Sequence, residues 1–183
     1  PLSDDELCGE AATYIGAGGD TAGITLSVGS SYLARSPAIQ EKLFHELQQA
    51  YPTKSEILTA HWSDLEKLPY LSACVYECLR ISLPVAGDLP RVVGQGGWEF
   101  KGAQIPAGTV VGSSATAVHM NPSLFPEPET FRPERWLDDS EDGGISKTLE
   151  SWLVSFSKGP RSCIGQTMGA SHFRLTFAWL QMR

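Results

Sequence analysis

Apolar residues at helical spacing run through the first 36 positions, and this feature most limits the folds open to the chain. Ser3-Asp4-Asp5-Glu6 has the form of a capping box, which marks a helix start. Ser36-Pro37 ends the pattern, because proline cannot continue a helix interior. One long helix is therefore predicted from about residue 4 to residue 36, carried by the apolar positions Leu7, Ala11, Tyr14, Ile15 and Ala22.

Further helices are predicted before any strand. Ser36-Pro37 restarts a helix that ends near Tyr51-Pro52, and Ser63-Asp64-Leu65-Glu66 is a second candidate capping box. Pro69 suits the first turn of a helix over residues 69–82, because its fixed φ matches that position. Its apolar stripe consists of Leu71, Cys74, Val75, Cys78 and Leu79.

The second half changes character after Pro84. Three short β-type runs at residues 91–93, 98–100 and 109–111, separated by glycine-rich turns, predict a small antiparallel sheet. Residues 121–144 contain four prolines and the acidic stretch Asp138 to Asp142, and they predict a long irregular surface segment. Helical spacing resumes from Gly165 to Met182. The fold class is therefore mainly α with a small antiparallel β-sheet, an α+β chain.

Composition excludes some partners. The chain has 183 residues with 21 acidic against 14 basic side chains, and the net charge of −7 argues against nucleic acid. Four cysteines are too few for a disulfide scaffold, so a reducing, intracellular compartment is expected. No apolar run is long enough to span a bilayer, and the start lacks a signal pattern. Both ends look like cuts in a longer protein.

The strongest chemical signal is the decapeptide Phe156-Ser157-Lys158-Gly159-Pro160-Arg161-Ser162-Cys163-Ile164-Gly165. Cys163 lies where a loop enters a helix, so free N–H groups and the helix dipole can stabilise a thiolate that binds a metal. Gly159 and Gly165 leave room for a flat macrocycle against the backbone, and Arg161 offers a cation to a carboxylate. An inert buried cysteine is the alternative.

This decapeptide resembles the haem-binding signature of the cytochrome P450 family, F-x-x-G-x-R-x-C-x-G, at each fixed position. Three other segments resemble the family's landmarks in the right order: Ala17 to Thr21, Glu77-Cys78-Leu79-Arg80, and Phe131 to Trp136. The resemblance implies the C-terminal part of the cytochrome P450 fold over residues 1–183. It implies an oxygen-binding helix over 1–36, an E-x-x-R helix over 69–82, a haem-binding loop over 156–165, and helix L over 166–183.

The resemblance also implies roles for single residues. Cys163 would be the axial thiolate ligand of haem b, and the cofactor would lie against Phe156, Gly159, Arg161 and Gly165, with Arg91 on a propionate. Asp20 and Thr21 would be catalytic and deliver protons to bound dioxygen. Thr21 bonded to a backbone carbonyl, and Arg91 as an ordinary surface arginine, are the alternatives. Residues 15–17 and 84–88 would line the substrate pocket.

The remaining motifs have structural interpretations. Glu77 and Arg80 share a helix face, either as a surface ion pair or, by the resemblance, in a buried network with Arg135. Cys74 and Cys78 have the spacing of half a zinc site, but core packing is the better interpretation because no second ligand pair accompanies them. His119 is expected to pack or to form hydrogen bonds.

The function that the resemblance implies is a haem-dependent monooxygenase that inserts one atom of dioxygen into a small lipophilic substrate. Electrons would come from a separate NADPH-dependent reductase, since no flavin or nicotinamide motif is present, and Lys158 is a candidate docking residue. A reductase-independent isomerase or dehydratase is one alternative, and a truncated, inactive haem-binding fragment is another; the 183-residue chain by itself is expected to be inactive. The residues at 156–159 and 131–136 resemble those of fungal enzymes of secondary metabolism. A missing N-terminal segment is the expected anchor to the endoplasmic reticulum.

Overall fold

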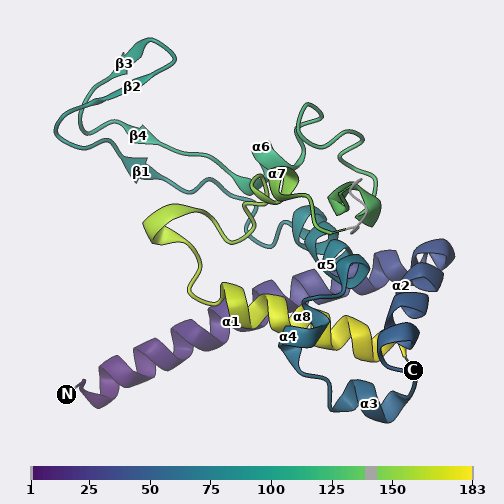
Figure 1. The fold of residues 1–183 in the computed structure, drawn as a ribbon. Helices are drawn as coiled ribbons and strands as arrows, with labels where there is room; N and C mark the ends of the chain where they lie inside the picture. Colours follow the sequence, from purple (N-terminus) through teal and green to yellow (C-terminus); the bar gives the residue numbers. More distant parts are fainter. Residues whose placement is uncertain (1, 139–143, 183) are drawn as a thin grey trace.

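The computed structural model describes residues 2–138 and 144–182, and helices dominate it (Figure 1). Helix α1 (Asp4–Ala34) begins with the predicted capping box, in which Ser3 Oγ accepts from the Glu6 N–H and Glu6 accepts from the Ser3 N–H. The N-terminal half of α1 extends beyond the other helices (Figure 1). None of the helices in the described part is both long and apolar enough to cross a membrane.

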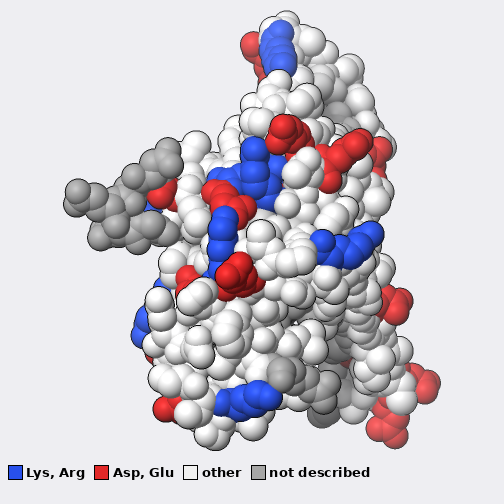
Figure 2. All heavy atoms as spheres, turned by 90° about the vertical axis from the view of Figure 1, so that its right-hand side faces the viewer, with Lys and Arg blue, Asp and Glu red and all other residues white. Residues whose placement is uncertain are grey.

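Three helices connect α1 to the centre of the chain: α2 (Pro37–Ala50), α3 (Lys54–Leu58) and α4 (Trp62–Leu65). The predicted capping box at Ser63 is wrong. His61 caps α4, because its Nδ1 accepts from the Ser63 N–H, so the helix starts one residue before Ser63. On the face turned toward α2, acidic and basic side chains are interspersed among uncharged residues (Figure 2).

Helices α5 (Pro69–Ser82) and α8 (Gln166–Gln181) form the core together with α1. Gly29 shows how closely they approach: a Cβ at this position would lie 2.6 Å from both Cys78 Sγ and Phe177 Cζ. Such a distance is shorter than carbon and sulfur atoms tolerate, so only glycine fits at this crossing. The crossing holds the three helices in fixed positions next to one another.

The strands form two separate ribbons, not the single sheet that the sequence predicts. Strand β1 (Arg91–Val92) pairs antiparallel with β4 (Val110–Val111), and β2 (Trp98–Phe100) pairs with β3 (Ala103–Ile105). The α+β class is confirmed. Both ribbons extend away from the helices (Figure 1).

Short helical turns occupy the region expected to be irregular and its surroundings. They are α6 (Ala115–His119), the 3₁₀ helix η1 (Pro133–Trp136), α7 (Lys147–Glu150) and the 3₁₀ helix η2 (Gly159–Arg161). Trp136 of η1 is fully buried, which corrects the prediction of a surface segment for this part. Of the acidic stretch Asp138 to Asp142, all but Asp138 lies outside the described residues.

Candidate functional site

Cys163 lies between η2 and α8, at the loop-to-helix junction that the sequence predicts. The Cys163 N–H donates to the Phe156 carbonyl at 2.8 Å and closes the loop, while the thiol remains exposed. A Cβ at Gly165 would lie 3.7 Å from Cys163 Sγ, an ordinary van der Waals distance, so the Gly165 backbone lies next to the sulfur. The loop therefore presents the thiol in open space.

The loop backbone contains two residues in the left-handed region, Ser157 at φ 60° and Gly159 at φ 76°. That region disfavours residues with a Cβ, so Gly159 satisfies a backbone requirement. An added Cβ at Gly159 would meet no described atom within 4 Å, so the space beside it is open. The non-glycine Ser157 carries strain, which is common where a loop must present a functional group.

The thiol faces a cavity of about 540 Å³. Helix α1, the segment after α5 and the cysteine loop form its walls, and most of the lining is apolar. Five of the predicted site residues are brought together here, namely Thr21, Arg91, Phe156, Arg161 and Cys163. Of the stretches predicted to line a pocket, Ala17, Pro84 and Val85 do so. The lining is completed by eight residues that no sequence pattern assigns to the pocket, namely Thr25, Leu79, Leu89, Ala115, Val154, Ser155, Ser157 and Phe173.

Helix α1 contributes a hydroxyl to the cavity. Thr21 Oγ1 donates to the Ala17 carbonyl at 2.7 Å, so the structural alternative for this residue is present. Thr13 makes the same bond to Gly9 at 2.9 Å on the exposed half of the helix. Thr21 thus differs from Thr13 in lining the cavity, whereas Asp20 is exposed and does not line it.

The charged side chains of the cavity lining are two arginines, Arg91 and Arg161. Arg91 Nη1 donates to the Pro90 carbonyl at 2.8 Å, and neither guanidinium is buried. Two cations beside an apolar space with an exposed thiol fit a flat apolar ligand that carries two carboxylates and a metal. The chemistry of these groups is therefore the chemistry that holds haem.

A buried carboxylate organises the region behind the cavity. Glu77 Oε1 accepts from Arg80 Nη2 at 2.8 Å, Arg135 Nε at 3.1 Å and the Arg132 N–H at 2.9 Å. Glu77 Oε2 accepts from Arg80 Nε and Trp136 Nε1, both at 2.8 Å. Glu77 and Arg80 are fully buried, which excludes the surface ion pair. The sequence did not predict the contact from Trp136, although an indole N–H is a hydrogen-bond donor.

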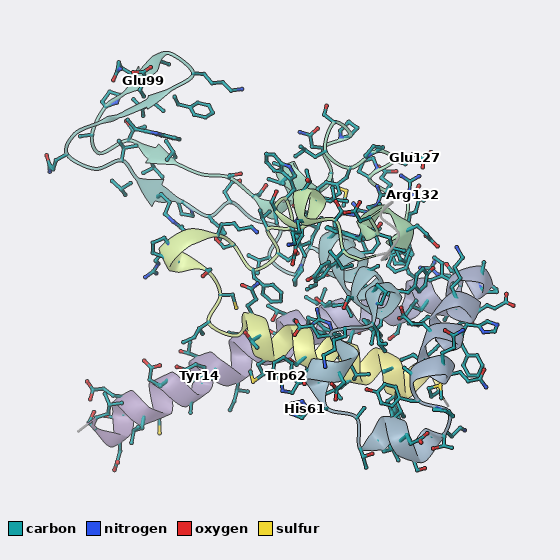
Figure 3. The ribbon with its side chains drawn as sticks, viewed as in Figure 1. Tyr14, His61, Trp62, Glu99, Glu127 and Arg132 are labelled. Carbon is teal, nitrogen blue, oxygen red and sulfur yellow. The ribbon has the colours of Figure 1, made fainter. Side chains whose placement is uncertain are left out.

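Arg80 uses all its donors. Besides Glu77, it donates to the carbonyls of His119 at 3.1 Å, Pro128 at 2.6 Å and Thr130 at 3.2 Å. At the outer side of the network, Arg132 lies beside Glu127 (Figure 3), with Nη1 3.0 Å from Oε2. The network therefore ties the irregular segment after α6 to helix α5.

Cys74 and Cys78 are buried in the helical core, as the packing interpretation predicts. Burial raises the pKa of both thiols. Within residues 2–138 and 144–182, no cluster of three or more histidine, cysteine or acidic side chains could hold a metal ion. The zinc interpretation thus lacks the additional ligands that it needs.

The cavity thus offers the groups that a haem-thiolate protein needs, an exposed thiol for the iron and two cations for the carboxylates. The chain belongs to the cytochrome P450 family, whose family model matches residues 1–181. The cofactor of this family is a haem with a cysteine thiolate ligand.

Relatives support this membership. The chain is 40% identical over 168 residues, 92% of its length, to cytochrome P450 monooxygenase ankB of Aspergillus thermomutatus. It is 39% identical over 97% of its length to cytochrome P450 monooxygenase BOT1 of Botryotinia fuckeliana. It is also 36% identical over its whole length to an inactive cytochrome P450 monooxygenase cloA of Claviceps fusiformis. The chain spans about a third of these relatives, 31%, 33% and 34% of their respective lengths.

Proposed function

We propose that the chain is the haem- and oxygen-binding part of a monooxygenase that acts on a small lipophilic substrate. One observation carries the proposal: the Cys163 thiol and the Thr21 hydroxyl, from opposite ends of the sequence, line the same apolar cavity. The similarity to fungal cytochrome P450 monooxygenases supports it. Similarity to a relative named as inactive means that activity must be measured.

The residues of the loop and of β1 would hold the cofactor. Cys163 would ligate the iron, and Arg91 and Arg161 would bind the propionates through charge-assisted hydrogen bonds. Phe156 would pack against the macrocycle, while Gly159 and Gly165 would leave space for it. When bound, a thiolate-ligated haem activates dioxygen, because the thiolate donates electron density that favours O–O cleavage.

Helix α1 would supply the protons. Thr21 Oγ1 can turn its proton from the Ala17 carbonyl toward the cavity, because a hydroxyl rotates freely about its bond. Asp20 is the next residue in the helix, exposed and outside the cavity lining. In this scheme Asp20 would relay a proton from water and Thr21 would deliver it into the cavity, so α1 would be the oxygen-binding helix.

The proposal extends to the substrate and to the electron donor. The apolar lining suits a lipophilic substrate, since burial of apolar surface drives such binding. Electrons come from an NADPH-dependent reductase, and exposed Lys158 next to the cysteine loop is the proposed contact. We place the reaction in fungal secondary metabolism.

The ligand assignment is tested by the spectrum of the reduced, carbon monoxide-bound form of the complete translated polypeptide. Cys163→Ala should abolish the thiolate-type Soret shift, and Cys8→Ala, at another exposed cysteine, should keep it. Retention of the shift in Cys163→Ala would refute the ligand assignment.

The catalytic assignment is tested with Thr21→Val against Thr13→Val, which removes the same kind of bond from the same helix. With NADPH, reductase, labelled dioxygen and a lipid extract of the source organism, wild type should place one labelled atom in a product. Thr21→Val should divert electrons to hydrogen peroxide, and Thr13→Val should not. Equal peroxide release from both variants would leave Thr21 only its structural bond.

A further inference from the structure

His119 is a fully buried histidine outside the cavity lining, at the C-terminal end of α6. Its Nε2 lies 3.0 Å from the Val154 N–H, and its Nδ1 lies 3.2 Å from the Arg80 carbonyl. An N–H can only donate, so Nε2 accepts and Nδ1 must carry the proton that it donates to Arg80. The ring is therefore neutral and joins helix α5 to the segment before the cysteine loop.

A neighbouring bond reinforces this link. Ser155 Oγ donates to the Leu79 carbonyl at 2.9 Å, beside the Arg80 carbonyl that His119 uses. These carbonyls belong to the last turn of α5, where the helix itself offers no partner. Two consecutive residues, Val154 and Ser155, are thereby held at the end of one helix.

The link continues to the thiol. Val154 and Ser155 line the cavity, and the Val154 carbonyl accepts from the Ser157 N–H at 2.9 Å. The Phe156 carbonyl accepts from the Cys163 N–H at 2.8 Å. One hydrogen bond to the His119 ring and two backbone hydrogen bonds thus hold the segment that leads from Val154 to Cys163.

We infer that His119 is a positioning residue for Cys163, since its ring sets the distance between the end of α5 and residues 154–157 and so fixes the direction of the thiol into the cavity. The inference rests on the proposed role of Cys163. A second role of the ring, its edge contact with Phe125 at 5.9 Å between centroids, concerns packing alone. The two roles predict different results for matched substitutions.

Three substitutions separate the bonds of the ring. His119→Gln places an oxygen where Nε2 accepts and keeps the bond from Val154. His119→Asn places an N–H where Nδ1 donates and keeps only the bond to Arg80. His119→Phe keeps the ring and its contact with Phe125 but loses both bonds.

The first measurement is the reduced, carbon monoxide-bound spectrum of the haem-loaded complete polypeptide at equal haem content. The thiolate-type fraction should be at least twofold lower in His119→Asn and His119→Phe, which leave the Val154 N–H without its acceptor, and less reduced in His119→Gln, which loses only the bond to the Arg80 carbonyl. Should the Phe variant fail to fold, the Asn variant decides. Wild-type thiolate fractions in the Asn variant would overturn the inference.

The second measurement needs no haem: exchange of the Val154 amide hydrogen. Exchange should be roughly tenfold faster in the Asn and Phe variants than in wild type and unchanged in the Gln variant, because only the first two lose the acceptor. Unchanged exchange in the Asn variant would also overturn the inference. By contrast, a thiolate-type spectrum in Cys163→Ala would refute the proposed function and leave the amide result standing.

Discussion

The charge network of Glu77 yields the sharpest prediction of stability. Glu77→Gln keeps the volume of the side chain but removes its charge from beside Arg80 and Arg135, which are 0% and 3% exposed. If the new amide NH₂ takes the Oε2 position, it faces the donors of Arg80 and Trp136, and two hydrogen bonds are lost. Breaking a buried ion pair in this way typically costs about 3–5 kcal/mol.

The control is the same substitution at an exposed glutamate. Glu127 lies 3.0 Å from Arg132, and both side chains are exposed, at 67% and 41%, so Glu127→Gln should cost less than about 1 kcal/mol. The measurement is urea unfolding of the complete translated polypeptide, followed by tryptophan fluorescence. The free energies of unfolding should differ by at least about 2 kcal/mol between the two variants. Equal costs would refute the reasoning that burial makes the Glu77 network strong.

Two further predictions use the same unfolding assay. Gly159→Ala should destabilise the fold by about 1–2 kcal/mol, because φ is positive there. Gly16→Ala, inside α1 with open space around it, should stabilise the fold by about 1 kcal/mol. A change of stability in the same direction in both variants would contradict the role of backbone conformation. Burial and the nearby Arg80 charge lower the pKa of His119 to about 4. Because the unfolded chain takes up the proton at a higher pH than the fold does, stability should fall as the pH drops from about 6.5 to 4. His119→Gln should flatten that dependence and His45→Gln, at an exposed position, should not; an unchanged profile in His119→Gln would exclude His119 as its source.

The helices were predictable where local chemistry decides them. The capping box at Ser3 set the start of α1, and proline set the start of α5 at Pro69. At Ser63 the same pattern predicted the wrong helix start, since the imidazole of His61 accepts from the Ser63 N–H that a capping box would pair with Glu66. The sequence did not predict strand β3. In the structure, Lys101 and Gly102 have φ angles of 50° and 80°, the two positive angles of a tight hairpin turn between β2 and β3.

The candidate site was likewise predictable only where neighbouring residues in the sequence form it. A motif identified Cys163 and its loop, because neighbouring residues shape that loop. The cavity wall at Val154, the donor Trp136 and the bridge through His119 depend on contacts between distant segments. No spacing in a sequence encodes such contacts, so they required the packed structure.

X-ray absorption at the iron edge of the haem-loaded complete polypeptide shows whether Cys163 holds the haem iron. Wild type and Cys8→Ala should both show a sulfur atom bound to the iron. Cys163→Ala should show nitrogen or oxygen ligands alone. Sulfur at the iron of Cys163→Ala, or its absence from wild type, would exclude Cys163 as the iron ligand.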